Sequence, residues 1–240
     1  FGGFPEVVAE SNTEQKIKNL ESYFELTVYK DIVERYKIRD SAFVKWFLKS
    51  LASSYTKEIS FNKIYLTLKS QGRKISKDEL YSYSSVVEDS LFAFYLPKFS
   101  TSVRKREPVS KVYLCDTGYA KLAETQEDIG KKMENAVFLE LLRRKTPLFE
   151  YFFWKNQQQE EVDFVVKKGR VVKELIQVCR DVSHLETQQR EVRALLKAGR
   201  ELKCKNLVIL TEGFEGEKKE QWFDLTGNIL YIPLWKWLLQ

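Results

Sequence analysis

Residues 160–179 read E-E-V-D-F-V-V-K-K-G-R-V-V-K-E-L-I-Q-V-C, and this stretch decides the fold of the second half of the chain. Two runs rich in β-branched residues flank Lys167–Arg170, a four-residue connector with one glycine, and this pattern predicts a β-hairpin. Side chains alternate between the two faces of a strand, so Gln177 and Cys179 share a face of the second strand. We therefore expect the hairpin to present Asp163, Gln177 and Cys179 together on one surface.

The segments around this hairpin alternate between helical and strand patterns. Apolar residues recur at helical spacing in two segments, and short runs of aromatic or β-branched residues lie between them. From residue 130 the sequence predicts a helix, three strands, a helix and a strand, at 130–145, 149–154, the two hairpin strands, 187–198 and 206–211. A strand at 229–232 and a terminal helix at 234–239 follow. This order resembles the αβββαβ core of restriction-endonuclease-like folds, an α/β (α+β) class.

Glu134 is a second candidate for a functional carboxylate. It falls on the inward-facing stripe of the helix predicted at 130–145, together with Met133, Val137, Phe138 and Leu141. Burying a carboxylate costs on the order of several kcal/mol unless it is paired, hydrogen-bonded or bound to a cation. Glu134 is therefore either a site residue or an acid at the edge of the stripe that reaches solvent or a structural arginine.

The first half of the chain predicts a helical module that ends in a hairpin. Helical stripes occur at 14–36, 41–51 and 59–68, and Ser76 and Glu79 form a capping box that opens a further helix. Two strands follow at 92–96 and 109–114, joined by a polar loop. Three helices, the last pair joined by a short turn and followed by a hairpin, predict a winged helix-turn-helix.

The basic residues of this module suggest a surface that contacts DNA. Lys77 begins the helix after the capping box, and the hairpin loop carries Arg104, Lys105 and Arg106. The outward face of the same helix also carries acids: Asp78, Glu88 and Asp89. Because acids repel phosphate, they oppose a DNA contact that the basic loop favours. The module therefore either binds duplex DNA or serves as a structural joint.

Composition sets limits on the class of protein. The 240 residues include 40 Lys and Arg against 34 Asp and Glu, a formal net charge of +6. This charge is compatible with a polyanionic partner but does not identify one. The apolar run at 229–239 is interrupted by Pro233 and Lys236 and is too short to span a bilayer, and no signal peptide is recognisable at the start. No membrane partner is expected.

The cysteine and histidine content argues against a zinc site or a disulfide framework. Cys115, Cys179 and Cys204 are widely spaced and form no C-x-x-C pair, and His184 is the only histidine. A reducing cytoplasm fits this cysteine usage. We expect His184 to be a solvated residue near the start of a helix.

Five short strings occur in order along the whole chain. They are G-G-F-P-E at 2–6, K-V-Y-L-C-D-T-G at 111–118, G-K-K-M-E-N-A-V at 130–137, E-V-D-F-V at 161–165 and I-P-L-W-K-W-L-L at 232–239. Together they resemble the second half of a family of prokaryotic, mainly archaeal, AAA-type ATPases. Proteins of that family have an N-terminal P-loop domain, then a winged helix, then a PD-(D/E)XK nuclease-like domain of unknown function.

This resemblance implies a degraded metal site. The glutamate of the E-N-x-V motif is Glu134, and the hairpin aspartate is Asp163. Where active nucleases have a third acid and a lysine, this chain has Gln177 and Cys179. In active members the acids hold Mg²⁺, which polarises the phosphate and activates water, and the lysine adds positive charge. The resemblance therefore implies that Glu134, Asp163 and Gln177 form a weakened Mg²⁺ site.

The missing lysine decides how much activity to expect. Loss of one electrostatic stabiliser typically lowers the rate by on the order of 10²–10³, and two are lost here. A displaced basic residue, Lys155 or Arg190, could supply part of the missing charge.

The chain contains no G-x-x-x-x-G-K-[ST] loop, so no ATP site is expected in it. ATP binding would belong to an N-terminal ATPase domain of the same parent protein.

Charge and Pro108 interrupt the pattern near residues 105–110 and suggest a domain boundary. We predict a helical lead-in at 1–40, a remnant of an ATPase lid, then a winged helix-turn-helix domain at 41–108 and a nuclease-like domain at 109–240. Because the chain begins at Phe1 rather than Met, we expect it to be part of a longer protein.

Three functions are compatible with the sequence. The leading hypothesis is a DNA-binding region of an AAA-type ATPase whose nuclease site is inactive or weak. The first alternative is an active Mg²⁺-dependent DNA nuclease in which Glu134 and Asp163 hold the metal. The second is a protein-binding assembly module.

Overall fold

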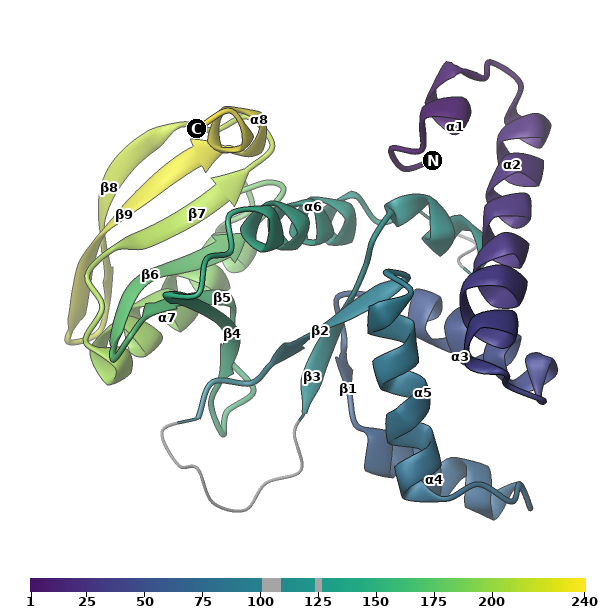
Figure 1. The fold of residues 1–240 in the computed structure, drawn as a ribbon. Coiled ribbons are helices and arrows are strands. Elements are labelled where there is room, and N and C mark those ends of the chain that lie inside the picture. The colour runs from purple at the N-terminus through teal and green to yellow at the C-terminus, as the bar shows by residue number, and fades with distance from the viewer. Residues whose placement is uncertain (101–108, 124–126) are drawn as a thin grey trace. The chain divides into compact units, whose positions relative to one another are not determined.

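The computed structural model describes residues 1–100, 109–123 and 127–240, which form two compact units (Figure 1). The first unit comprises residues 1–95 and the described residues from 109 to 128; the second comprises 96–100 and 129–240. The boundary predicted between residues 108 and 109 differs from this division. Its physical reason is strand pairing, since Ser110 and Lys111 pair with Ile59 and Glu58 and so belong to the sheet of the first unit.

The chain up to residue 128 is mainly helical. Its elements are α1 Pro5–Ala9, α2 Thr13–Leu26, the wide helical segment η1 Thr27–Glu34, α3 Ser41–Ser53, β1 Glu58–Ile59, α4 Phe61–Ser70, α5 Lys77–Asp89, β2 Ala93–Pro97, β3 Ser110–Leu114 and the 3₁₀ segment η2 Thr117–Leu122. The three strands form a small sheet in the order β1-β3-β2. α2, α3, α4, α5 and the two later strands lie close to the predicted positions, whereas α1, β1 and η2 were not predicted.

Side-chain caps explain where several of these helices begin. Asn12, Asp40, Ser60 and Ser76 each accept a hydrogen bond from a backbone N–H in the first turn of the helix that follows. At α5 the Glu79 N–H donates to Ser76 Oγ at 3.1 Å, so the N-cap predicted there is confirmed. Each cap satisfies a donor that the helix cannot satisfy internally.

The second unit is a six-stranded mixed sheet with helices on both faces. Its elements are α6 Ile129–Arg143, β4 Phe149–Lys155, β5 Glu161–Lys168, β6 Val171–Val178, α7 Leu185–Leu202, β7 Leu207–Thr211, β8 Gly216–Trp222, β9 Leu225–Pro233 and α8 Leu234–Leu238. The strand order is β4-β5-β6-β7-β9-β8. The predicted order of helix, three strands, helix and strand is therefore present, and β8 is an addition that the sequence did not predict.

The two faces of the sheet are covered by different helices. α7 packs on β5, β6, β8 and β9, whereas α6 contacts β6 and α8 contacts β7 and β9 (Figure 1). Because both faces are covered, Val162, Phe164 and Val165 of β5 are all fully buried. A strand covered on both sides reads as a continuous hydrophobic run rather than a clean alternation. Asp163 interrupts this run at a position that is itself buried.

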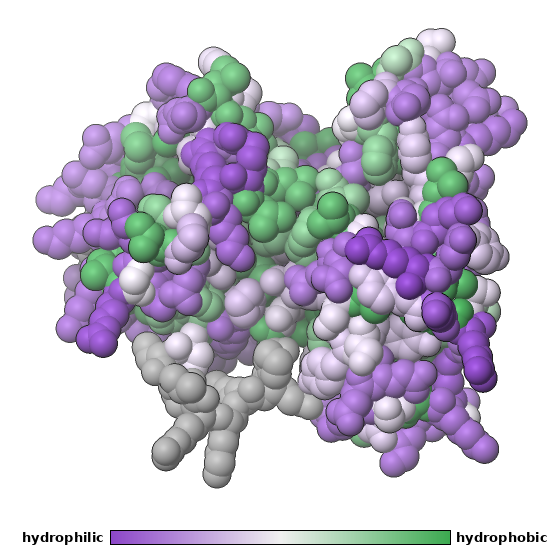
Figure 2. Space-filling view, viewed as in Figure 1, coloured by the Kyte–Doolittle hydropathy of each residue, from purple (hydrophilic) through white to green (hydrophobic). Residues whose placement is uncertain are grey.

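The surface of the molecule is mostly hydrophilic on the face drawn in Figure 2, with hydrophobic residues interspersed. Within the part of the chain that the structure describes, no helix is both long enough and apolar enough to cross a membrane.

Asp116 ties the start of the chain to η2 in the first unit. Its carboxylate accepts the N–H of Gly3 at 2.7 Å and the N–H of Gly118 at 2.6 Å. Gly2 has φ +81°, and a Cβ built there would collide with the Asp116 carboxylate. The G-G and D-T-G strings of the sequence are therefore two halves of one contact.

We predict that Asp116→Ala lowers the free energy of unfolding of the first unit by about 2–3 kcal/mol, because two hydrogen bonds to a charged group are lost. Chemical denaturation followed by circular dichroism measures this. Glu21→Ala, which removes an exposed carboxylate from α2, is the matched control and should change little. Equal effects of the two substitutions would show that the Asp116 contact does not stabilise the unit.

Glu140 holds the end of α6 through two arginines. Its carboxylate accepts hydrogen bonds from Arg143 at 2.7 Å and from Arg144 at 2.5 Å. The bond from Arg143 and the charges of both arginines outweigh burial and lower the Glu140 pKa from 4.5 to about 2. Arg144 also donates to the carbonyl of Trp237 at 2.9 Å and lies over the Trp237 ring, which attaches α8 to α6.

A lowered carboxylate pKa stabilises the fold above the unfolded value and loses that effect as the pH falls through the folded value. The second unit should therefore lose stability between pH 4.5 and about 2 as Glu140 becomes protonated. In Glu140→Gln this part of the pH dependence should be absent, because residue 140 no longer titrates. Denaturation midpoints across this range test it; identical pH profiles for both proteins would contradict the assignment.

Candidate functional site

The candidate site lies where β5 and β6 separate. Their registered pairs run from Lys168↔Val171 to Phe164↔Ile176. Beyond that point side chains take the place of ladder hydrogen bonds: the Asp163 N–H donates to Gln177 Oε1 at 3.1 Å, and the Val178 N–H donates to Asp163 Oδ2 at 3.0 Å. This exchange satisfies two backbone donors at the position where the strands diverge.

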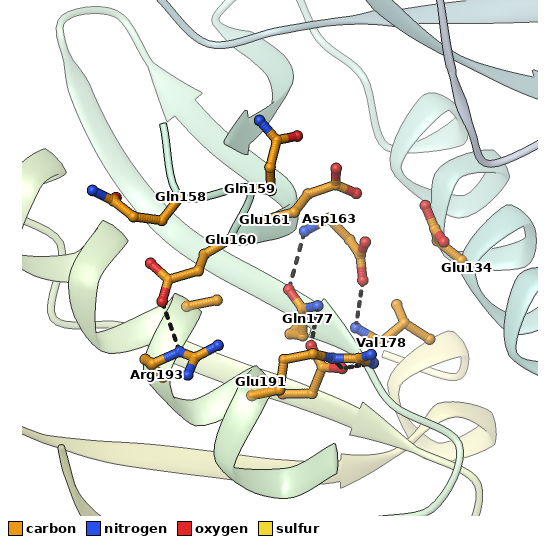
Figure 3. A pocket seen from close by; sticks show the side chains of 12 residues that line it. Glu134, Gln158, Gln159, Glu160, Glu161, Asp163, Gln177, Val178, Glu191 and Arg193 are labelled. Atoms are coloured by element: carbon orange, nitrogen blue, oxygen red, sulfur yellow. Dashed lines mark hydrogen bonds and ion pairs between the residues drawn. The ribbon is translucent and has the colours of Figure 1, made fainter. Parts of the chain in front are cut away.

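A pocket of about 390 Å³ opens beside this point (Figure 3). Five carboxylates and two guanidinium groups line it: Glu134, Glu160, Glu161, Asp163 and Glu191, with Arg190 and Arg193. Figure 3 shows Glu134 on a separate helix, α6, across from Asp163. The three predicted metal-site residues, Glu134, Asp163 and Gln177, therefore line one pocket.

Gln177 joins the two strands to α7. While its oxygen accepts the Asp163 N–H, its Nε2 donates to Glu191 Oε2 at 2.5 Å (Figure 3). Arg190 binds the other oxygen of the same carboxylate, with Nε at 3.0 Å and Nη2 at 2.5 Å from Glu191 Oε1. Asp163, Gln177 and Glu191 are all buried. The result is a chain of hydrogen bonds from β5 through β6 to the helix.

The surroundings of Glu191 act on its pKa in opposite directions. Burial raises its pKa, and the nearby Asp163 charge raises it further, while Arg190 and Gln177 act in the opposite direction. Two carboxylates in one low-dielectric site disfavour each other's ionised form. The Gln177 amide and the Arg190 guanidinium are the groups that make this pair of acids tolerable.

Glu160 is neutralised by a second group of cations at the other side of the pocket. Arg193 Nε lies 2.6 Å from Glu160 Oε1, and Lys197 Nζ donates to both Glu160 oxygens at 2.8 Å. Burial opposes its ionisation, but Lys197 and Asn156 outweigh burial and lower the Glu160 pKa. α7 thus supplies most of the positive charge around the pocket.

The structure places Cys179 in the core rather than in the pocket. Its side chain packs in a hydrophobic cluster with residues of α7 such as Val192 and Leu195, and its Sγ lies 3.4 Å from the Asp181 carbonyl. Burial, together with the Glu191 charge, raises the pKa of the thiol to about 11. A neutral thiol at this depth cannot replace the lysine charge of active nucleases.

The remaining predicted residues lie outside this pocket or outside the described part of the chain. Lys77 is exposed at the first position of α5, with its ammonium 5.5 Å from the centre of the Tyr65 ring. Arg104, Lys105 and Arg106 lie outside the described residues. His184 is exposed near the start of α7, as expected.

The two candidates for a displaced positive charge also differ. Lys155 lies 3.5 Å from Glu161, a carboxylate of the pocket. Arg190 itself lines the pocket and pairs with Glu191. No group of three or more His, Cys, Asp or Glu side chains with an arrangement suited to a metal ion occurs in residues 1–100, 109–123 and 127–240.

Glu191 was not among the site residues predicted from the sequence. The signal was present, because Glu191 adjoins Val192 and precedes Leu195 by four residues, which puts a carboxylate on the inward stripe of a helix. Glu134 was selected by the same criterion, and the same cost of burying a carboxylate applies to both. In Glu191 the partners turn out to be an amide and an arginine of the chain itself.

Comparison with known proteins divides the chain between residues 128 and 129, where the second compact unit resumes. Residues 1–128 match the domain of unknown function DUF8612, and residues 129–236 match the domain of unknown function DUF4143. DUF4143 is a domain found in proteins associated with AAA ATPases. No solved structure matches the chain.

Two curated relatives are similar to this chain. An uncharacterized protein of Methanocaldococcus jannaschii is 35% identical over 241 residues, which cover all of this chain and 54% of that protein. An uncharacterized protein of Haemophilus influenzae is 27% identical over 175 residues, 70% of this chain and 42% of that protein. The chain spans about half the length of these relatives. Since one family model matches more than half of the chain, the chain belongs to the DUF8612 family and carries a DUF4143 domain at residues 129–236.

Proposed function

We propose that this chain is the DNA-binding region of a cytoplasmic AAA-type ATPase, and that its nuclease-like domain has lost metal-dependent cleavage. The hydrogen bonds of the Gln177 side chain are the main support for the proposed loss of cleavage. Both ends of its amide are engaged, the oxygen by the Asp163 N–H and the nitrogen by Glu191. An amide whose two polar atoms already have partners in the protein stabilises the fold of the site and has no free atom with which to bind a metal ion.

The charges around Gln177 argue in the same direction. Mg²⁺ requires near-octahedral oxygen ligands and benefits from several carboxylates. Here Asp163 Oδ2 already accepts the Val178 N–H, and Glu191, another acid of the pocket, is bound by Arg190. The Asp163 charge also acts on Arg190. A fixed guanidinium therefore supplies positive charge where a cation would otherwise be needed, and the residues present do not fit a catalytic Mg²⁺ site.

The arrangement of the first unit supports DNA binding. Its order of helix, strand, two helices and two strands (α3, β1, α4, α5, β2, β3) is the order of a winged helix. Lys69 and Lys77 flank the Tyr65 ring at 6.0 and 5.5 Å from its centre, at the turn between α4 and α5. The association of DUF4143 domains with AAA ATPases supports the choice of parent protein.

We predict that the chain does not cleave duplex or single-stranded DNA in Mg²⁺ or Mn²⁺ in a manner that depends on Asp163. The measurement is a gel-based cleavage assay of wild type and Asp163→Asn, the latter chosen to keep an acceptor for the Val178 N–H. Cleavage by the wild type that disappears in Asp163→Asn would show an active nuclease and reject the proposal.

A second prediction concerns the place of the amide. Gln177→Glu puts a carboxylate against Glu191, so it should lower the free energy of unfolding by about 1–3 kcal/mol at pH 8 and by less at pH 5. The sign follows because a buried acid with a raised pKa destabilises the fold as the pH rises and it becomes ionised. Combining Gln177→Glu with Glu191→Gln exchanges the two groups and should recover most of the loss.

Chemical denaturation of the three proteins at pH 5 and pH 8 tests this exchange. If the single and double variants were equally stable at pH 8, the Gln177–Glu191 hydrogen bond would not be what holds the site together.

A further inference from the structure

In the second unit, a cluster of exposed cations lies at the end of the sheet opposite to the pocket. The pocket lies at the start of β5 and the end of β6, whereas the turn between these strands lies at the other end, at Gly169 and Arg170. From Asp163 to Lys168 the strand runs roughly 17 Å, at about 3.3 Å per residue. Six exposed cations gather at this far end: Lys145, Lys168, Arg170, Lys173, Lys203 and Lys205. We call them the basic rim.

The topology brings these residues side by side from four separate segments. Lys168 of β5 pairs with Val171 of β6, and Arg170 lies in the turn between them. β6 and β7 run parallel with Leu175 opposite Leu207, and the residues two positions earlier are Lys173 and Lys205.

The C-terminal ends of α6 and α7 contribute two further cations to the rim. Lys145 follows the end of α6 just before β4, and Lys203 follows the end of α7 just before β7. The rim therefore runs across the ends of neighbouring strands. The negative end of the helix dipole favours basic residues at helix C-termini, which explains Lys145 and Lys203. The other four cations of the rim do not follow a helix C-terminus.

The rim is not neutralised by the carboxylates around it. In the described ranges, none of its six cations forms an ion pair, whereas the neighbouring Lys167 and Arg200 pair with Glu150 at 2.6 Å and Asp224 at 2.9 Å. Glu174 accepts a hydrogen bond from Asn206, and burial raises its pKa. Glu201, in the last turn of α7, is the remaining exposed carboxylate there. The balance of charge at this end is strongly positive.

We propose that the basic rim is the surface through which the second unit binds the phosphate backbone of DNA. This inference rests on the DNA-binding function proposed above and assigns it to a surface away from the nuclease-like pocket. Neighbouring strands are about 4.8 Å apart, so the row from β4 to β7 spans roughly 14 Å. One DNA strand rises about 3.4 Å along the helix axis per nucleotide and turns as it rises, so this row can face about two or three phosphates of one strand.

A lipid surface fits the rim less well. Peripheral membrane binding requires a broad apolar face that is buried in the headgroup region. Among the described residues, the large exposed apolar side chains at this end of the sheet are Leu148, Val171 and, in the β8–β9 turn, Phe223, which are too few for a broad apolar face. Cations arranged in a row match a linear polyanion better than a planar one.

The position of the rim also explains how DNA can bind without meeting the acidic pocket. Five carboxylates line the pocket, and acids repel phosphate. DNA held at the rim avoids this repulsion, because the pocket lies at the opposite end of β5 and β6.

The test compares two triple variants of the whole chain that lose the same charge. The rim variant carries Lys168→Ala, Arg170→Ala and Lys173→Ala. The control variant carries Lys18→Ala, Arg39→Ala and Lys219→Ala, three exposed residues outside the rim. Binding to a fluorescent duplex of about 20 base pairs is measured by anisotropy at several salt concentrations between about 50 and 200 mM. Thermal unfolding confirms that both variants are folded.

Each lost phosphate contact should make the slope of log K against log salt shallower by about 0.9. We expect the rim variant to lose about 2–3 in slope and to bind more weakly on every sequence tested, while the control variant stays close to wild type. Equal binding and slope in the rim and control variants, with DNA binding intact in wild type, would overturn the rim assignment alone.

Two other outcomes are distinguishable. If wild type shows no salt-dependent DNA binding, the proposed function itself fails. If wild type binds vesicles of anionic phospholipid but not DNA, and the rim variant loses that binding, the rim is a membrane-binding surface and the assignment to DNA is wrong.

Discussion

The Gln177 amide is the constraint on which the second unit depends. It sits where β5 and β6 separate, and one side chain satisfies a backbone donor of β5 and a buried carboxylate of α7. Burial of Asp163 and Glu191 in the same place would be costly without it, since the Asp163 charge and burial both disfavour the ionised form of Glu191. The helix that covers this face of the sheet is therefore attached through a polar network as well as through its apolar stripe.

This network shows how a buried pair of carboxylates can be held without a cation. A carboxylate at position 177 would need a cation to balance it against Asp163 and Glu191. An amide at that position and a guanidinium from Arg190 provide the balance from within the chain. The buried thiol of Cys179 stays neutral and packs against α7. These side chains hold the sheet and the helix together.

Much of this fold could be predicted from local sequence, for reasons that the elements illustrate. The glycine turn at Gly169, the cap at Ser76 and the stripe of α6 are signals that a few neighbouring residues determine. The strand β8 was missed because Gly216–Trp222 is a polar edge strand that has no hydrophobic run of its own. The boundary near residue 108 was misplaced because the pairing of β3 with β1 joins residues more than 50 positions apart. Pairing between strands so far apart in the chain gives no signal in the local sequence.

The site was predictable in part for the same reason. Asp163 and Gln177 share a hairpin, so their proximity follows from strand geometry, and Glu134 was found from the cost of a carboxylate on an apolar stripe. The partners that define what the site does, Glu191 and Arg190, come from α7, and only the packing of that helix on the sheet brings them to Gln177. The separation of the acidic pocket from the basic rim is likewise a property of the sheet, since both are drawn from distant segments.

We propose that the Gln177 side chain is held by Asp163 and Glu191 and is not available to a cation. The most direct test is the nuclear magnetic resonance signal of the Gln177 side-chain amide during a titration with Mn²⁺, which broadens the signals of nearby protons. The account predicts that the Gln177 signal and the Val178 backbone signal persist, with no more broadening than exposed surface amides show. Selective loss of both signals at less than stoichiometric Mn²⁺ would place a cation at this site and contradict the account.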